Sequence, residues 1–256
     1  MIIDAHAHLG NRNNTNIDFY LKEMEKYGIN KTIFCPGDMV DVVKMADFMR
    51  GNEPLMNFEP HNEWIKAAIE AYPDKVYGFF MVDPEIHNID DVKTAIIDGF
   101  VGIKLNPLIN KIDFYSEFLG DIFELSSKWN IPIYTHLTMN PKANIESLAW
   151  AIDKYSPIVI IGHMGFSSAD WEAVQLCKEY ENVYLETSVG SFLAIKNAIP
   201  YIGAGKIIFG TEGPSHNAKV ELTKIEMLEL PEADKELILH KNIERIIENE
   251  TPGKDY

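Results

Sequence analysis

Short apolar runs rich in β-branched residues alternate with longer stretches of helical periodicity along the whole chain. Turn residues and polar stretches separate each run from the helical stretch that follows it. Regular alternation of this kind is typical of repeated strand–helix units, which assemble into a parallel sheet. The predicted strands are Ile2–Ala5, Lys31–Pro36, Val76–Val82, Val101–Leu105, Ile131–Thr135, Ile158–Gly162, Val183–Glu186 and Ile207–Gly210. Helical stretches between them include Asn62–Tyr72 and Trp171–Glu179.

The number of units indicates one closed barrel. Eight units in 256 residues leave about 32 residues for each unit, which is close to the unit length of a single (β/α)8 barrel. Glycine and proline fall between the elements, and no flexible linker divides the chain. We therefore expect an α/β protein with one TIM-barrel domain over residues 1–256.

The connection between Pro36 and Asn62 is unusually long for a loop between a strand and a helix. It contains several methionines and two phenylalanines. One interpretation is a partly helical cap over the barrel mouth, whose flexible methionine side chains shape a substrate pocket. The other is that these residues only pack the insertion onto the barrel. Both interpretations predict a cap-like insertion after the second strand.

Composition and charge restrict the class of partner. The chain has 23 basic and 39 acidic residues, a formal net charge of −16, and no cluster of lysine and arginine, which argues against nucleic acid. No apolar run reaches the length of about 18 residues that a membrane span needs, and no basic segment precedes the first apolar residues. We expect a soluble, cytoplasmic protein that acts on a small molecule, as a monomer or a homo-oligomer. Its two cysteines, Cys35 and Cys177, predict no disulfide framework and are interpreted as inert packing residues.

Polar side chains follow several predicted strands. In Asp4-Ala5-His6-Ala7-His8, residues i and i+2 of a strand share a face, so His6 and His8 would aim two imidazoles at one point, which suits a metal ion. Active-site residues of a barrel lie where the strands end and the strand–helix loops converge. The same rim is predicted to receive Lys104, His136, His163 and Glu212. Imidazoles with one carboxylate form a partly open site suited to zinc.

These motifs, in this order and spacing, resemble the amidohydrolase superfamily, in its amidohydrolase-related branch of metal-dependent TIM-barrel hydrolases and decarboxylases. The similarity runs nearly end to end, through the segments Ile3–His8, Asn62–Trp64, Tyr72–Pro84, Gly99–Leu105, Thr135–His136, Ile161–Gly165, Phe209–Thr211 and Asn242–Ile247. The resemblance implies that His6, His8 and His136 bind one or two divalent metal ions, usually Zn²⁺. It also implies that His163 is either a second metal ligand or the group that polarises the substrate or the metal-bound water.

The chain departs from this family at strand eight, where the usual aspartate is replaced by Glu212. The additional methylene changes the geometry, but a carboxylate there could still hold the metal and accept a proton from bound water. The alternatives are an inactive site and a carboxylate with a purely structural role. Glu186, at the end of strand seven, is either a hydrogen-bonded carboxylate of the rim or a group that supports a metal ligand.

Two cationic side chains are candidates for binding the substrate. Lys104 has three interpretations: a carboxylated lysine that bridges two metals, as the resemblance implies for some binuclear branches; an ammonium that binds a substrate anion; or a partner in an ion pair with Glu186 or Glu212. Arg12, in the loop after the first strand, either binds a substrate carboxylate or is a solvated loop residue.

We predict a metal-dependent hydrolase of the amidohydrolase type that opens a C–N or C–O bond of a small cyclic amide, ester or lactone. Metal-activated water attacks, Glu212 takes its proton, and His163 stabilises the developing oxyanion. The alternative is a metal-dependent, non-oxidative decarboxylase of a small carboxylic acid. A third hypothesis is a binding or vestigial barrel that has lost turnover through the change at Glu212. A dihydroorotase is disfavoured, because those enzymes resemble one another in an arginine at the position of Gly10.

Overall fold

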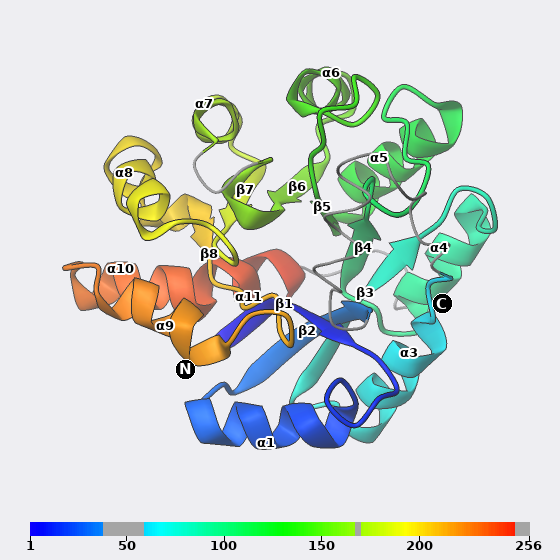
Figure 1. Cartoon of the computed structure of the whole chain (residues 1–256). Coiled ribbons are helices and arrows are strands. Elements are labelled where there is room, and N and C mark those ends of the chain that lie inside the picture. Colours follow the sequence, from blue (N-terminus) through cyan, green and yellow to red (C-terminus); the bar gives the residue numbers. More distant parts are fainter. Residues whose placement is uncertain (38–58, 167–169, 249–256) are drawn as a thin grey trace, which may run out of the picture.

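Eight parallel strands form a barrel in a computed structural model that describes residues 1–37, 59–166 and 170–248 (Figure 1). The strands follow one another in sequence order around the sheet, each hydrogen-bonded to the next. They are β1 (Ile3–Leu9), β2 (Lys31–Pro36), β3 (Val76–Val82), β4 (Gly102–Leu105), β5 (Pro132–Thr135), β6 (Ile158–Ile161), β7 (Val183–Glu186) and β8 (Ile207–Ile208). The predicted (β/α)8 TIM barrel is confirmed. The predicted cap-like insertion after the second strand falls largely on residues 38–58, which lie outside the described residues.

Helices alternate with the strands and form the outer ring of the barrel (Figure 1). They are α1 (Ile17–Tyr27), α3 (Asn62–Ala71), α4 (Ile89–Ile97), α5 (Glu117–Trp129), α6 (Ile145–Tyr155), α7 (Trp171–Glu179), α8 (Phe192–Ile202), α9 (Ala218–Glu226), α10 (Glu232–Glu236) and α11 (Asn242–Ile247). Short 3₁₀ turns cover Gly162–Met164 and Ala204–Lys206, and a π-helical turn covers Leu237–Lys241. Among these described helices, none combines the length and the apolar character that crossing a membrane requires.

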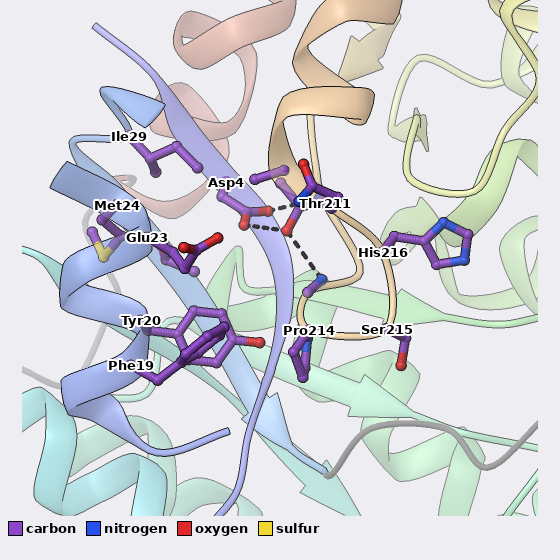
Figure 2. A pocket seen from close by; sticks show the side chains of 14 residues that line it. Asp4, Phe19, Tyr20, Glu23, Met24, Ile29, Thr211, Pro214, Ser215 and His216 are labelled. Atoms are coloured by element: carbon purple, nitrogen blue, oxygen red, sulfur yellow. Dashed lines mark hydrogen bonds between the residues drawn. The ribbon is translucent and has the colours of Figure 1, made fainter. Parts of the chain in front are cut away.

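Strand β1 changes its register halfway along, and this shift places the histidines. Asp4 pairs with Thr32 of β2, but Ala7 pairs with Phe34, so two residues of β1 oppose one residue of β2. Such a bulge reverses which face the following side chains occupy. Asp4 consequently faces outwards into a cavity of about 220 Å³ beside α1 (Figure 2), whereas His6, two residues later, lies inside the barrel. The sequence predicted β1 to end at Ala5, and the structure extends it to Leu9.

The loop after β8 completes the barrel against β1. His6 O accepts hydrogen bonds from the backbone N–H of Glu212 at 2.8 Å and of Thr211 at 3.3 Å, and His8 N donates to Gly213 O at 2.8 Å. The Asp4 carboxylate adds a side-chain link, because it accepts from Thr211 N at 2.9 Å and from Thr211 Oγ1 at 2.6 Å. These bonds fix the backbone of Glu212 directly beside the two histidines of β1.

Two apolar clusters hold these elements in place. The larger one fills the space between the strands and the ring of helices. The smaller one fills the barrel interior with one or two side chains from most strands and is closed by α11. Its members are Ile3, Ala5, Ile33, Phe79, Tyr134, Ile160, Ile208, Ile243 and Ile246. Since the interior is a packed core, polar side chains gather only at the ends of the strands.

Candidate metal centre

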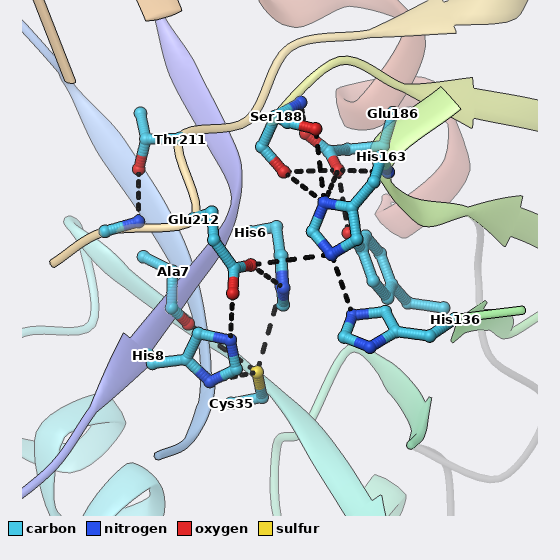
Figure 3. Close-up of polar contacts among 12 residues, drawn as sticks. His6, Ala7, His8, Cys35, His136, His163, Glu186, Ser188, Thr211 and Glu212 are labelled. Atoms are coloured by element: carbon cyan, nitrogen blue, oxygen red, sulfur yellow. Dashed lines mark hydrogen bonds and ion pairs between the residues drawn. The ribbon is translucent and has the colours of Figure 1, made fainter. Parts of the chain in front are cut away.

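Three histidines and one carboxylate converge at the carboxyl ends of the strands (Figure 3). One ligand atom each from His6, His136, His163 and Glu212 lies within 4.8 Å of all the others. His6 Nε2 is 2.7 Å from Glu212 Oε2, and His163 Nε2 is 3.1 Å from His136 Nε2 and 3.7 Å from the same Glu212 oxygen. Donors at about 2.0–2.1 Å from one tetrahedral metal are separated by about 3.3 Å, so these side chains surround a space of the right size.

Glu212 bridges the two histidines of β1. Its Oε2 contacts His6 Nε2, and its Oε1 lies 3.2 Å from His8 Nε2. The longer side chain therefore keeps its carboxylate in the centre, although the family's usual residue at this position is aspartate. Of the four residues predicted as metal ligands, His6, His136 and Glu212 lie in this cluster, whereas His8 lies outside it and contacts Glu212.

Backbone strain is concentrated around this centre. His163, Met164 and Val189 have φ values of 60°, and Glu212 has a φ of 55°, all in the left-handed region that non-glycine residues rarely adopt. Each such residue costs about 1 kcal/mol or more, and strain of this kind clusters at functional sites. The two other described non-glycine residues with positive φ, Asn130 and Ser156, are helix C-caps, whereas His163 and Glu212 carry the side chains predicted to take part in catalysis.

Glu186 hydrogen-bonds the backbone of His163. It is fully buried and accepts hydrogen bonds from Tyr134 OH at 2.7 Å, from Ser188 Oγ at 2.8 Å and from His163 N at 3.3 Å. His163 Nδ1 in turn lies 3.1 Å from the carbonyl oxygen of Ser188. A carbonyl only accepts, so Nδ1 carries the proton and Nε2 keeps its lone pair for the centre. Glu186 is thus a hydrogen-bonded carboxylate that also contacts His163, and both interpretations of it stay predictions.

The electrostatic environment favours the metal-binding protonation state at His136, His163 and Glu212, but not at His6 and His8. Burial favours the neutral form of His6 and His8, but the neighbouring Glu212 and Cys35 outweigh it and raise the pKa of both imidazoles, so a metal competes with a proton there. Burial, reinforced by Lys104, holds the pKa of His136 well below its usual range, and burial also lowers the pKa of His163. Burial alone would raise the pKa of Glu212, but the neighbouring imidazoles outweigh it and hold the pKa of this carboxyl well below its usual range. Neutral imidazoles and an ionised carboxylate are the forms that bind divalent ions. In addition, His136 Nδ1 is buried and has no hydrogen-bond partner among the described residues. The donor set fits a divalent metal.

Lys104 lies beneath the centre and is fully buried. Its Nζ is 2.7 Å from His136 Nε2 and 3.5 Å from His6 Nε2, and it sits 4.1 Å from the centroid of the Tyr134 ring. Burial lowers the pKa of Lys104 to about 8. Within the described part of the chain Lys104 makes no ion pair with a glutamate, so that interpretation was wrong. The carboxylated and anion-binding interpretations stay predictions.

Arg12 and Cys35 both lie outside the cluster around Glu212. Arg12 is exposed in the loop between β1 and α1 and is not a member of the cluster around Glu212. Cys35, interpreted as an inert packing residue, is a member of a second buried group with His6 and His8. The signal for Cys35 was its place at the end of β2, where the register sets it directly beside His8. That register becomes visible only once the bulge in β1 is known.

Comparison with known proteins places this chain in a family. The family described as amidohydrolase matches residues 3–248. No curated protein matches the chain. Among solved structures, 2,6-dihydroxybenzoate decarboxylase from Rhizobium is 18% identical with a TM-score of 0.69, covering 96% of this chain and 98% of the other.

Two further structures have similar scores. A 5-carboxyvanillate decarboxylase from Novosphingobium aromaticivorans, with bound manganese, is 16% identical with a TM-score of 0.73, covering 96% of this chain and 97% of its own. A probable 2-pyrone-4,6-dicarboxylic acid hydrolase from Acinetobacter baumannii is 16% identical with a TM-score of 0.68, covering 96% and 98%. At these identities the similarity demonstrates a shared fold.

Proposed function

The chain belongs to the amidohydrolase family, and on this basis we propose that it is a metal-dependent hydrolase. Its substrate is a small cyclic amide, ester or lactone, in which it opens a C–N or C–O bond. The observation that carries this proposal is the convergence of the buried Glu212 carboxylate with the imidazoles of His6, His136 and His163. We assign His6, His8, His136 and Glu212 as the metal-binding residues.

A divalent metal bound there, Zn²⁺ or Mn²⁺ by its donor set, would polarise the substrate carbonyl and acidify a bound water. Glu212 Oε2 then serves as the base that accepts the proton of the attacking water. His163 Nε2 lies 3.7 Å from this oxygen and has its lone pair directed into the centre. The proton can therefore pass from Glu212 to His163. The resulting imidazolium stabilises the oxyanion and protonates the leaving nitrogen or oxygen.

Lys104 changes its partner when the centre is loaded. A neutral imidazole has one lone pair, so His136 Nε2 cannot both accept a hydrogen bond from Lys104 at 2.7 Å and bind a metal. Loading therefore frees the amine of Lys104, whose pKa of about 8 lets it exist in either protonation state near neutral pH. In its charged form it binds an anionic group of the substrate. Arg12, in the exposed loop between β1 and α1, is assigned to bind a substrate carboxylate outside the metal centre.

Decarboxylation of a small carboxylic acid is a second candidate. The buried amine of Lys104 beside the centre offers a partner to a substrate carboxylate. A decarboxylase needs such a group to bind the carboxylate that it removes. Two of the similar solved structures are decarboxylases of aromatic acids, one with bound manganese. Glu212 would then take a proton from solvent and deliver it to the carbon that loses CO₂, whereas in a hydrolase it takes a proton from the attacking water.

Product analysis in labelled water separates the two candidates. The protein is loaded with Zn²⁺ or Mn²⁺ and tested on a panel of cyclic amides, lactones and hydroxybenzoic acids, with Glu212→Gln as the inactive control. Hydrolysis incorporates one ¹⁸O from the solvent into the opened product. Decarboxylation releases CO₂ and incorporates a solvent proton instead. Metal-loaded protein that turns over neither class would contradict the proposal and favour a vestigial barrel.

A further inference from the structure

Cys35 lies behind the two imidazoles of β1, on the side away from Glu212 (Figure 3). Its Sγ is 3.5 Å from His8 Nδ1 and 3.8 Å from His6 Nδ1, and its side chain is fully buried. The same two rings direct their Nε2 atoms at Glu212, at 2.7 Å from His6 and 3.2 Å from His8. Each imidazole therefore has one nitrogen on the carboxylate and the other beside the sulfur, although His8 Nδ1 also lies 3.5 Å from the carbonyl oxygen of Pro36.

The sulfur can accept from both rings at once. Its own S–H has a separate acceptor in the carbonyl oxygen of Ala7, 3.6 Å away, which leaves the sulfur lone pairs to the ring N–H groups. A ring that carries its proton on Nδ1 presents a lone pair on Nε2, which is the form a metal ligand needs. At His6 Nδ1 the sulfur is the single hydrogen-bond partner among the described residues.

The main chain of Gly37 packs against the side of His8 that faces the sulfur. A Cβ added at Gly37 would lie only 2.4 Å from His8 Nδ1, so the main chain of Gly37 closes over this nitrogen. His6, His8 and Cys35 also form a group whose ligand atoms lie within 4.8 Å of one another, so a metal bound by the sulfur is the competing arrangement that the test has to distinguish. The Nε2 atoms of both rings face Glu212, which favours a metal on that side and Cys35 as a hydrogen-bond acceptor on the other.

We propose that Cys35 is a positioning residue of the metal centre, whose sulfur accepts the Nδ1–H groups of His6 and His8 and so fixes the tautomer in which both Nε2 atoms face the metal. The inference rests on the proposed metal centre. Ligand histidines usually donate to a carboxylate, a carbonyl or water, one partner for each ring. Here one buried sulfur serves two ligands of the same strand, so its removal affects both, and His6 more, because His8 Nδ1 keeps the carbonyl oxygen of Pro36.

The test is the Zn²⁺ affinity of the purified protein, measured by competition with a chromogenic chelator. Cys35→Ala removes the acceptor and Cys35→Ser keeps a smaller one. Cys177→Ala is the matched control, because Cys177 is equally buried but donates to Val183 O at 3.2 Å, behind α7 and away from the centre. We expect Kd to rise about 10- to 100-fold in Cys35→Ala, by less in Cys35→Ser, and not at all in Cys177→Ala.

Two outcomes would overturn the role of Cys35 alone. If the wild type binds Zn²⁺ and both folded Cys35 variants bind it equally well, the sulfur does not position the ligands. If the Co²⁺-loaded wild type shows a sulfur-to-cobalt charge-transfer band that Cys35→Ser abolishes, the sulfur is a direct ligand. A wild type that binds no metal would overturn the centre itself. Should Cys35→Ala fail to fold, Cys35→Ser and the cobalt spectrum decide the question.

Discussion

Glu212 is the residue at which this chain departs from the usual pattern of its family, and its two oxygens reach two different imidazoles. Glu212→Gln keeps the shape but removes the charge and the proton acceptor, so we expect activity to be abolished and metal affinity to fall only in part. Glu212→Asp restores the usual residue but shortens the reach. Because a misplacement of about 1 Å can cost about 10²-fold in rate, we expect kcat/KM to fall by about that factor. Full activity in both variants, with unchanged metal content, would exclude any catalytic role of Glu212.

His163 is held by Ser188 and Glu186, and its Nε2 faces both His136 and Glu212. Its replacement by alanine should lower kcat by about 10² or more while the protein keeps its metal, as expected for a group that transfers a proton. Turnover and elemental metal content are measured on the same preparation. Loss of a full metal equivalent from a protein that binds two would instead assign His163 to a second metal site, together with carboxylated Lys104.

Most of the cluster could be predicted from the sequence, because the carboxyl ends of parallel strands meet at one rim. His136 and His163 directly follow predicted strands, and Glu212 is the second residue after one, so their meeting followed from the fold alone. Cys35 was missed for a physical reason. Its neighbours are apolar, as in any buried strand, and its contact with His8 depends on a pairing register that the local sequence does not encode.

At the scale of elements, the join between β1 and the loop after β8 decides where the centre forms. Thr211 donates to Asp4 through its backbone N–H and its hydroxyl, and its Oγ1 also accepts from Gly213 N at 3.1 Å. Thr211→Val keeps the shape but leaves a buried carboxylate and a backbone N–H each without one partner. We expect the free energy of unfolding to fall by about 1–3 kcal/mol.

Urea denaturation measures this loss, with Thr94→Val on the exposed face of α4 as the matched control. The control should change the free energy of unfolding by less than about 0.5 kcal/mol. Equal stability of the two variants would show that the link between Asp4 and Thr211 does not contribute to closing the barrel.

Strand boundaries show where sequence patterns suffice. The strands Lys31–Pro36, Val76–Val82 and Val183–Glu186 match their predicted bounds, because their apolar runs end at clear turn residues. Strands β1 and β8 were predicted wrongly at their carboxyl ends. The bulge carries β1 through the polar residues up to Leu9. Strand β8 ends at Ile208, and the next residue, Phe209, donates from its N–H to Ile238 O in the π-helical turn and accepts from Ala5 N at its carbonyl oxygen.

At the scale of the whole molecule, the alternation of strands and helices was sufficient to predict the barrel and the rim at which its chemistry lies. It does not identify the substrate. Specificity in this architecture depends on the loops above the rim, which vary independently of the barrel. The family match covers residues 3–248, and the similar solved structures include decarboxylases and a hydrolase. One barrel architecture therefore occurs with different reactions. The shared centre is therefore the claim to test first.

Metal content tests that centre most directly. Protein purified without chelator, reconstituted with Zn²⁺ or Mn²⁺ and freed of excess metal, is analysed for bound metal beside the variant His6→Ala/His8→Ala. The wild type should hold about one equivalent, because its imidazoles and carboxylate form a nearly complete ligand set, and the variant should hold none. A wild type without metal, or a variant that retains it, would contradict the account.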